Sequence, residues 1–446
     1  MNRTLQGLTY FVRTFGCQMN SHDSERVSGM LEELGLIQSD QEHADVVVFM
    51  TCCVREAADT RLFGQVSSMK NLPAPESGKR IVAIGGCIGQ RDGDFLFEKL
   101  DNLNVVFGTH TIADLPSLIL EAYETGKKVS SLTDKSLVPS TDLASKREVD
   151  FQAWVPITMG CDNFCTYCIV PYVRGREYSR DFDQVVGEVE LLANQGVKEI
   201  TLLGQNVNSY GRDLYGKPRF AELLSAMDST GIERVRFVTS HPKDLSDETI
   251  EAFKNTKCVM PAMHLALQSG SDKILKAMNR KYTAKHFLDR VNKLKAAVSN
   301  VALSTDIIIG FPGETEGDFQ ATYDLVKEVN FAQVFTFIYS KREGTPAAKL
   351  VDNTPREVIQ ERFDRLVKLV QASAYDNNLK DLNNTIDVLV EGSSKRDDRM
   401  LSGRSPRNST VHIPLPDAKE VKDFVGKIIP VHVTEAKTWY LRAEMV

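Results

Sequence analysis

The sequence predicts an α/β protein with three folded parts: a doubly wound parallel sheet, a central open (β/α)6 barrel and a small antiparallel β-barrel. Strand-like runs alternate with amphipathic helical patterns over most of the chain, which is the order found in parallel α/β sheets. From Thr385 onward the apolar residues alternate with polar ones, as in antiparallel strands. At 446 residues the chain is also too long for one ordinary domain. We place the first sheet at 8–125, a linker at 126–146, the barrel at 147–378 and the last domain at 379–446.

The first domain contains three apolar strand-like runs, each followed by a helical pattern: TYFVRTF, ADVVVFM and RIVAIGG. A βαβαβ order forms a parallel sheet with right-handed crossovers, and ligands bind outside the carboxyl ends of its strands. Cys17, Cys52 and Cys87 closely follow these runs. We therefore expect the topology to bring these distant cysteines to one rim of the sheet.

The second domain follows a polar stretch without periodicity, which is typical of a linker. From Phe151 to Pro346 there are six strand-like runs: AWVPITM, KEITLLG, RVRFVTS, AMHLALQ, VALSTDIIIG and QVFTFIYS. Six units are too few for a closed (β/α)8 barrel, so we expect an open one whose strand-end loops carry the chemistry.

The C-terminal part begins with a long amphipathic helix predicted at Pro355–Leu382. Five strand-like runs follow it: TIDVLVEG, MLSGR, STVHIPL, GKIIPVHVTEA and TWYLRAEMV. This number of short strands predicts a small antiparallel barrel of the OB-like type.

The composition is that of a globular protein, with 42% hydrophobic and 26% charged residues. A net charge of −6 excludes a uniformly basic surface, so nucleic acid must be bound by local basic patches. The apolar runs are too short to span a bilayer, and the N-terminus lacks the apolar core of a secretory signal. We therefore expect a cytoplasmic protein with no membrane partner. In that setting the eight cysteines indicate metal ligands or reactive thiols before disulfides.

Cys161, Cys165 and Cys168 have a C-x3-C-x2-C spacing after the first barrel strand. Three thiolates can bind three irons of a [4Fe–4S] cluster and leave the fourth iron open. The alternative is a zinc knuckle, which requires a fourth ligand, but the next cysteine is Cys258. Cys17, Cys52 and Cys87 also offer three thiolates, and for them the alternative is a set of buried core thiols.

The run GCDNFCTYC, followed by six βα units, resembles the radical S-adenosylmethionine (SAM) superfamily. The resemblance implies that SAM chelates the open iron through its amino and carboxylate groups. An electron from the cluster then cleaves SAM to methionine and a 5′-deoxyadenosyl radical. It also implies that SAM is contacted by Tyr167, at the adenine, and by strand-end residues Gly204, Gln205, Asn206, Gln268, Gly310 and Pro312. The alternative for the strand-end residues is that they form ordinary turns and caps.

Three further motifs, TFGCQMNSHDSE, MTCCVRE and GGCIGQR, resemble those of the methylthiotransferase family. The resemblance implies that Cys17, Cys52 and Cys87 bind an auxiliary cluster, either [4Fe–4S] or [3Fe–4S]. The second motif usually has Asn-Thr-Cys-Ser, whereas this chain has Met-Thr-Cys-Cys, so Cys53 competes with Cys52 as the ligand. Cys258 matches no motif and is predicted to lie in the core.

The stretch VPYVRGREYSR is similar to the branch of this family that acts on isopentenylated adenosine in tRNA. Arg174, Arg176 and Arg180 lie in it and suit phosphate or base recognition; the alternative is salt-bridged surface arginines. The last domain resembles a TRAM domain, a small RNA-binding module. Its predicted RNA contacts are Lys395, Arg396, Arg399, Arg404 and Arg407, and the alternative is an ordinary charged hairpin.

The resemblance implies conversion of N6-isopentenyladenosine at tRNA position 37 to its 2-methylthio derivative. One SAM would methylate a sulfide of the auxiliary cluster, and a second would supply the radical that removes the C2 hydrogen. We expect as partners the anticodon stem-loop and a flavodoxin-type reductant, with a monomeric chain. The target adenine is expected to turn outward and lie between the two clusters.

Two alternatives are a sibling enzyme and a protein without catalytic activity. The sibling would act on threonylcarbamoyladenosine in tRNA or on an aspartate of a ribosomal protein. The non-catalytic alternative is an RNA-binding protein with zinc-stabilised loops, which would contain zinc and no iron.

Overall fold

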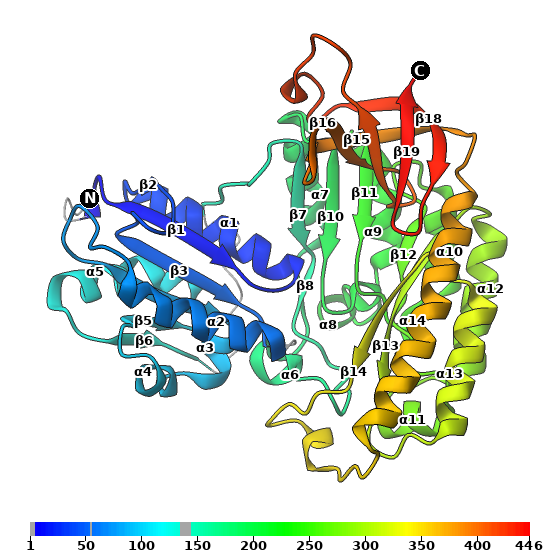
Figure 1. The fold of residues 1–446 in the computed structure, drawn as a ribbon, viewed down its shortest axis with the longest axis horizontal. Coiled ribbons are helices and arrows are strands. Elements are labelled where there is room, and N and C mark those ends of the chain that lie inside the picture. Colours follow the sequence, from blue (N-terminus) through cyan, green and yellow to red (C-terminus); the bar gives the residue numbers. More distant parts are fainter. Residues whose placement is uncertain (1–4, 54–55, 134–143) are drawn as a thin grey trace. The chain divides into compact units, whose positions relative to one another are not determined.

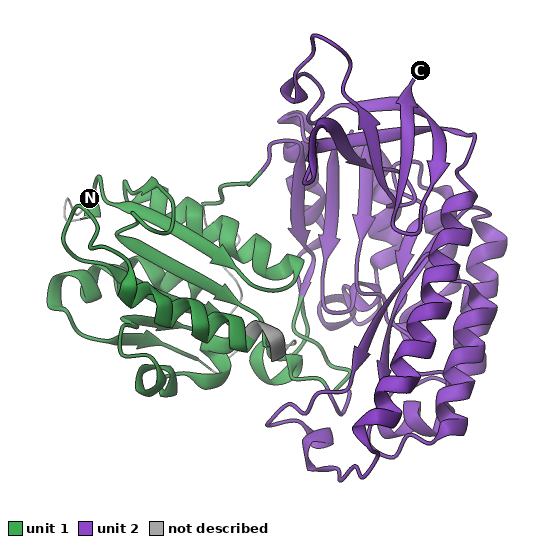
Figure 2. Cartoon of the chain, viewed as in Figure 1, with its two compact units in different colours: residues 1–148, 159–164, 168–178 green, residues 149–158, 165–167, 179–446 purple. Residues whose placement is uncertain are grey.

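The computed structural model describes residues 5–53, 56–133 and 144–446 (Figure 1). The chain forms two compact units, shown in different colours in Figure 2. The first comprises residues 1–148, 159–164 and 168–178, and the second comprises residues 149–158, 165–167 and 179–446. The two units are described separately below.

The first unit is built on a six-stranded parallel sheet with the order β2-β1-β3-β4-β5-β6. Its strands are β1 (Thr9–Thr14), β2 (Ile37–Gln38), β3 (Val46–Thr51), β4 (Ile81–Gly86), β5 (Val105–Phe107) and β6 (Val129–Ser131). The central strands β3 and β4 are buried along their whole length and consist mainly of apolar residues. Such apolar strands are expected where both faces of a parallel sheet are covered.

Helices cover both faces of this sheet: α1 (Gln18–Glu33), α2 (Glu56–Ser68), α3 (Cys87–Asp92), α4 (Phe95–Lys99) and α5 (Leu115–Thr125). Alternate residues of β3 enter different cores, since successive side chains of a strand point to opposite faces. Val48 packs in the core that contains α1 and α5, whereas Phe49 packs in the core that contains Leu62 of α2. The prediction of a doubly wound sheet is thus confirmed.

The predicted linker at 126–146 is wrong at its start. Val129–Ser131 form β6, which pairs in parallel with β5 and extends the sheet by one edge strand. The run is short and polar, so its sequence pattern alone gave no strand signal. Residues 134–143 of this stretch lie outside the described residues.

The second unit contains six parallel strands of an open barrel: β7 (Gln152–Pro156), β10 (Glu199–Leu203), β11 (Arg234–Phe237), β12 (Ala262–His264), β13 (Ala302–Ile309) and β14 (Gln333–Ile338). They form the sheets β7-β10-β11 and β12-β13-β14, and parallel bridges such as Ser240 to Leu265 connect them. β7 and β14 are the outer strands. The predicted open (β/α)6 barrel is confirmed.

The main helices around this barrel are α7 (Phe182–Asn194), α9 (Phe220–Ala226), α10 (Asp247–Asn255), α12 (Ala284–Ala297), α13 (Glu316–Val329) and α14 (Arg356–Leu379). Side chains of Asp181, Ser246, Thr283 and Thr315 cap four of these helices by accepting hydrogen bonds from backbone amides. In the described part of the chain, none of the helices has the length and apolar character needed to cross a bilayer.

The C-terminal strands form a closed barrel with the order β15-β16-β17-β19-β18. They are β15 (Thr385–Ser394), β16 (Asp397–Arg404), β17 (Thr410–Pro414), β18 (Ile428–Ala436) and β19 (Tyr440–Met445). Arg234 and Arg236 at the start of β11 donate hydrogen bonds to backbone carbonyls of this barrel. The small barrel therefore docks near the amino ends of the large barrel's strands, away from their carboxyl ends.

Candidate functional site

The cysteines of the first unit lie at the carboxyl ends of three adjacent strands. Cys17 is the N-cap residue of α1, just after β1; Cys52 follows β3; and Cys87 begins α3, directly after β4. Thr51 and Gly86, which precede Cys52 and Cys87, are register partners in the sheet. The predicted meeting of these cysteines at one rim is confirmed.

Close backbone packing defines this rim. Gly16 has φ +143°, and a Cβ there would come within 2.5 Å of the Cys52 Cβ, so only glycine fits. The Thr51 hydroxyl donates to the Gly85 carbonyl at 2.6 Å and accepts from the Ile88 amide at 3.2 Å. These bonds fix the end of β3 against the start of α3, and they hold the two cysteine-bearing turns side by side.

The thiols at this rim interact in pairs. The Cys52 thiol hydrogen-bonds to Cys17 and, with the charge of Arg174, lowers the pKa of Cys17 to about 5. The Cys53 thiol hydrogen-bonds to Cys87 and, again with Arg174, lowers the pKa of Cys87 to about 7. The bond to Cys87 and burial raise the pKa of Cys53. Both shifts favour the thiolate, which is the form in which cysteine binds metal.

The donor set at the rim is made of sulfur, which suits an iron–sulfur cluster. Cys53 lies at the rim beside Cys52, and both are buried, so the competition predicted between them stays open. Among the described residues, no group of three or more His, Cys, Asp or Glu side chains is placed to hold a single metal ion. The three ligands of a cluster bind different irons, so they stand farther apart than the ligands of one ion.

Arg174 is not an RNA-contacting residue, contrary to the prediction from its sequence context. It is 3% exposed, and its Nη2 donates to Asn20 Oδ1 at 2.8 Å and to Asp23 Oδ2 at 3.0 Å. The partners come from α1, about 150 positions earlier in the chain, so a local sequence pattern could not predict this contact. Its guanidinium faces the cysteine rim of the same unit.

Cys161, Cys165 and Cys168 lie on the segment between β8 (Thr158–Met159) and α6 (Val170–Val173). This segment begins with Gly160 at φ +75°, where a Cβ would lie 2.1 Å from the Arg176 carbonyl oxygen. Phe164 has φ +46°, a left-handed conformation that is uncommon for a bulky residue. Backbone strain of this kind persists where the surroundings demand it and clusters at functional sites.

Arg280 is a residue that sequence reasoning missed at this segment. It is 7% exposed, and its Nη1 donates to Cys165 Sγ at 3.4 Å. Its other bonds go to the Ala266 carbonyl at 2.6 Å and the Tyr282 hydroxyl at 3.0 Å. A guanidinium donates a charge-assisted hydrogen bond, which orients the sulfur that accepts it. Arg280 lies 115 positions from Cys165, and only the fold brings them together.

Tyr167 packs against an apolar group of residues from segments that follow strands of the barrel: Ile274, Met278, Phe311 and Ala347. Thr166 ties the same segment to this group, because its amide donates to the Met278 carbonyl at 3.0 Å and its carbonyl accepts from the Ala347 amide at 2.8 Å. Tyr167 is therefore close to the loop that contains Gly310, another residue predicted to contact SAM.

The remaining residues predicted to contact SAM differ in whether their polar groups are already bonded within the protein. The Asn206 amide is used within the protein: it donates to Asp244 at 2.7 Å and accepts from the His241 amide at 3.3 Å. The buried Gln205 Oε1 has no hydrogen-bond partner among the described residues. Gln268 has φ +71° and bridges to β13. Gly204 approaches Thr158 so closely that a Cβ would lie 2.2 Å from its hydroxyl.

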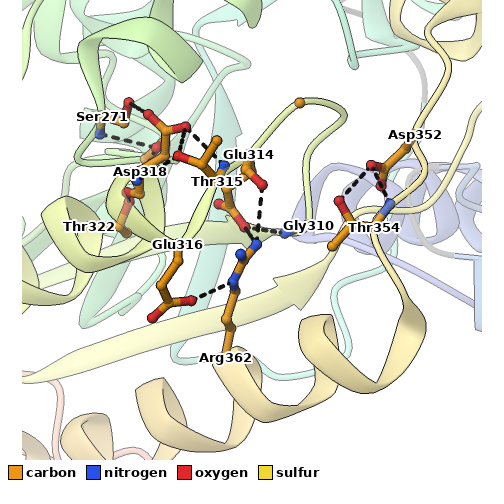
Figure 3. A network of polar contacts seen from close by, with 12 residues as sticks. Ser271, Gly310, Glu314, Thr315, Glu316, Asp318, Thr322, Asp352, Thr354 and Arg362 are labelled. Atoms are coloured by element: carbon orange, nitrogen blue, oxygen red, sulfur yellow. Dashed lines mark hydrogen bonds and ion pairs between the residues drawn. The ribbon is translucent and has the colours of Figure 1, made fainter.

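A polar network fixes the loop from Gly310 to Glu314 (Figure 3). Glu314 Oε2 accepts from the Gly310 amide at 2.9 Å and from Arg362 Nη1 at 3.4 Å, and Arg362 Nε also donates to Glu316 at 3.0 Å. Burial raises the pKa of Glu314 to about 7 despite the Arg362 charge. Arg362 projects from α14, as Figure 3 shows, so this helix holds the loop that contains Gly310 and Pro312 in place.

The two other arginines after the Cys161–Cys168 segment differ in exposure. The Arg176 side chain is 71% exposed, pairs with Asp162 at 2.8 Å and stacks over the Phe164 ring. The Arg180 side chain is 14% exposed and pairs with Glu188 at 2.6 Å. Arg176 is the more accessible of the two to a polyanion.

The predicted basic patch of the C-terminal barrel is smaller than expected. Lys395, Arg396 and Arg399 are exposed at the β15–β16 hairpin. Arg404 is partly exposed and pairs with Glu391 at 3.5 Å. Arg407 is buried and bonds to Asp381 at 2.9 Å, which removes it from the RNA-contacting set. The buried carboxylate of Asp381 neutralises the charge of Arg407, so this arginine does not contribute to a basic RNA-binding surface.

Comparison with known proteins matches each part of this architecture. Residues 155–326 match the model of the radical SAM superfamily, residues 9–108 that of uncharacterized protein family UPF0004, and residues 380–446 that of the TRAM domain. Among solved structures, the radical SAM methyltransferase TsrM of Kitasatospora setae, with cobalamin and a [4Fe–4S] cluster bound, has a TM-score of 0.53. It is 14% identical, and the match covers 77% of each chain, which supports the fold alone.

Relatives of much higher identity align with almost the whole chain. A tRNA-2-methylthio-N(6)-dimethylallyladenosine synthase of Thermoanaerobacter sp. (strain X514) is 45% identical over 99% of this chain and 93% of the relative. Enzymes of the same name from Carboxydothermus hydrogenoformans and Streptomyces coelicolor are 43% and 46% identical over 98% of this chain, and over 99% and 87% of the relatives. The chain therefore belongs to the tRNA-2-methylthio-N(6)-dimethylallyladenosine synthase family within the radical SAM superfamily.

Proposed function

We propose that this chain is a tRNA methylthiotransferase that converts N6-isopentenyladenosine at tRNA position 37 to its 2-methylthio derivative. The observation that carries the proposal is the presence of two cysteine sets, one at the rim of the first sheet and one on the Cys161–Cys168 segment, in a chain that matches relatives of this name along its length. The TRAM domain is consistent with an RNA substrate. We further infer a flavodoxin-type reductant and a monomeric enzyme.

The two sets have different roles in this proposal. Cys161, Cys165 and Cys168 would hold a [4Fe–4S] cluster with one iron open to SAM. Cys17, Cys52 and Cys87 would hold an auxiliary cluster, [4Fe–4S] or [3Fe–4S]. When bound, the first supplies the electron that cleaves SAM, and the second supplies the sulfur of the product.

Other residues of the chain bind and orient SAM and tRNA. Tyr167 and its apolar neighbours offer a surface for the adenine of SAM. Gly310, with φ +72° and no side chain, is buried at the strand end, and Glu314 and Arg362 hold its backbone in position. The exposed Lys395, Arg396 and Arg399 would contact phosphates of the tRNA.

The experiment that tests the function is anaerobic reconstitution with iron and sulfide, followed by incubation with SAM, a reductant and isopentenylated tRNA. Mass spectrometry of the digested nucleosides should show the methylthio product. Cys165→Ala should form neither 5′-deoxyadenosine nor product. Cys87→Ala should form 5′-deoxyadenosine without product, and the core variant Cys258→Ala should keep both activities.

Two results would contradict the proposal. Full activity on tRNA that lacks the isopentenyl group would exclude isopentenylated adenosine as the required substrate, and full activity on threonylcarbamoyladenosine tRNA would favour the sibling reaction. Multiple turnovers of methylthiolation by Cys87→Ala would exclude the auxiliary-cluster role. The names of the relatives favour the isopentenyl substrate.

A further inference from the structure

Arg174 occupies an unusual position in the first unit. Its backbone is fixed at the end of α6: its amide donates to the Val170 carbonyl at 2.8 Å, and the preceding carbonyl, of Val173, accepts from the Thr109 hydroxyl at 2.6 Å. Its guanidinium is 3% exposed and bonds through Nη2 to Asn20 and Asp23. A long cationic side chain is thus held in one orientation inside the protein.

One terminal nitrogen of this guanidinium lacks a well-formed hydrogen bond within the described residues, although the Arg174 side chain interacts with the Cys87 thiol. Nη1 is buried and makes no hydrogen bond to any residue that the structure describes. Leaving a buried charged donor unpaired is costly, so such a group indicates a partner that the polypeptide itself does not supply. The groups around Arg174 are Asn20, Asp23, Cys17 and Cys87, and the last two are proposed cluster ligands.

The ion pair with Asp23 accounts for Nη2 of Arg174 but not for Nη1. Asp23 is 2% exposed and interacts with both Arg174 and His22, whose Nδ1 lies 3.7 Å from Asp23 Oδ1. A cluster held by three thiolates is anionic, and it offers sulfur acceptors where Cys17 and Cys87 lie.

We propose that Arg174 is a positioning residue of the auxiliary site, where Nη1 donates a hydrogen bond to a cluster sulfur and the guanidinium charge favours the reduced form. This inference rests on the proposed function, because it requires the auxiliary cluster. Hydrogen bonds to the sulfurs and local charge are the means by which a protein sets the reduction potential of such a cluster. Asp23 in turn moderates the charge of Arg174.

The test measures the midpoint potential of the auxiliary cluster by EPR-monitored titration. The background is the full chain with Cys161→Ala, Cys165→Ala and Cys168→Ala, so that only the auxiliary site takes up iron. Arg174→Met should lower the reduced-to-oxidised ratio at a fixed potential about tenfold, a shift of about 59 mV to more negative values. Asp23→Asn leaves Arg174 in place with less compensation, and it should shift the potential in the opposite direction.

The matched control is Arg176→Met, two positions along the chain, which removes an exposed guanidinium bonded to Asp162 and should leave the potential unchanged. Unchanged potentials in Arg174→Met and Asp23→Asn, or shifts of the opposite sign, would overturn the inference. If Arg174→Met does not fold, the direction of the Asp23→Asn shift decides. Absence of iron from the background variant would instead contradict the proposed function, so the two failures are distinguishable.

Discussion

Glu199 is predicted to be the main electrostatic anchor between the large barrel and the C-terminal barrel. Its Oε2 lies 2.9 Å from Arg236 Nε and 4.0 Å from Arg234 Nη1. The two guanidiniums donate at 2.8 to 3.1 Å to backbone carbonyls of the C-terminal barrel, those of Asp387, Arg404, Ser405 and Pro406. All three charged side chains are at most 10% exposed, so one carboxylate balances two buried cations.

The perturbation is Glu199→Gln, which keeps the shape and one acceptor oxygen but removes the negative charge. Removing one partner of a buried ion pair costs about 3–5 kcal/mol, because the remaining charge is left buried without compensation. Most of this loss should fall on the docked C-terminal barrel, since the arginines bind its carbonyls. With a urea m-value of about 1–3 kcal/mol/M, the midpoint should fall by at least about 1 M.

The assay is urea unfolding followed by the fluorescence of Trp439, which lies between β18 and β19. The chain has two tryptophans, so a Trp154→Phe background assigns the signal to the C-terminal barrel. Glu233→Gln is the control: Glu233 is 48% exposed, pairs with Lys198, and should cost no more than about 1 kcal/mol. The reasoning fails if Glu199→Gln unfolds at the wild-type midpoint, or if Glu233→Gln is equally destabilising.

Three further predictions concern the two cysteine sites and the SAM loop. The folded-state pKa of Glu314 is raised to about 7 from 4.5, so its contribution to stability is complete below pH 4.5 and is lost as the pH rises through 7. Between pH 5 and pH 8 the free energy of unfolding of the wild type, measured with urea, should therefore fall by about 2–3 kcal/mol relative to that of Glu314→Gln. Equal pH profiles of the two proteins would contradict this prediction. Arg280→Met should slow 5′-deoxyadenosine formation at least about tenfold through loss of the charged bond to Cys165, with partial recovery in Arg280→Lys; wild-type rates in both would exclude the role. In the background in which Cys161, Cys165 and Cys168 are alanine, Cys52→Ser should lose bound iron and Cys53→Ser should retain it. The reverse result would identify Cys53 as the ligand.

Much of the architecture could be predicted because it is encoded locally. The change from helical to alternating periodicity marks each strand and helix, and the apolar runs before Cys17, Cys52 and Cys87 place these residues at strand ends. The topology of a parallel sheet then determines that neighbouring strand ends share a rim. The short polar strand β6 was missed, since it has too few apolar residues to give a periodic signal.

The three-part fold and both sets of cysteines could be predicted from local patterns, since periodicity and ligand spacing are properties of short segments. Which charged side chains remain exposed to a ligand depends on contacts between distant segments. Arg174 and Arg407 are buried against Asp23 and Asp381, and Arg280 reaches Cys165 from more than a hundred positions away. The burial of a charge depends on a partner supplied by a distant segment, and no local pattern specifies that partner.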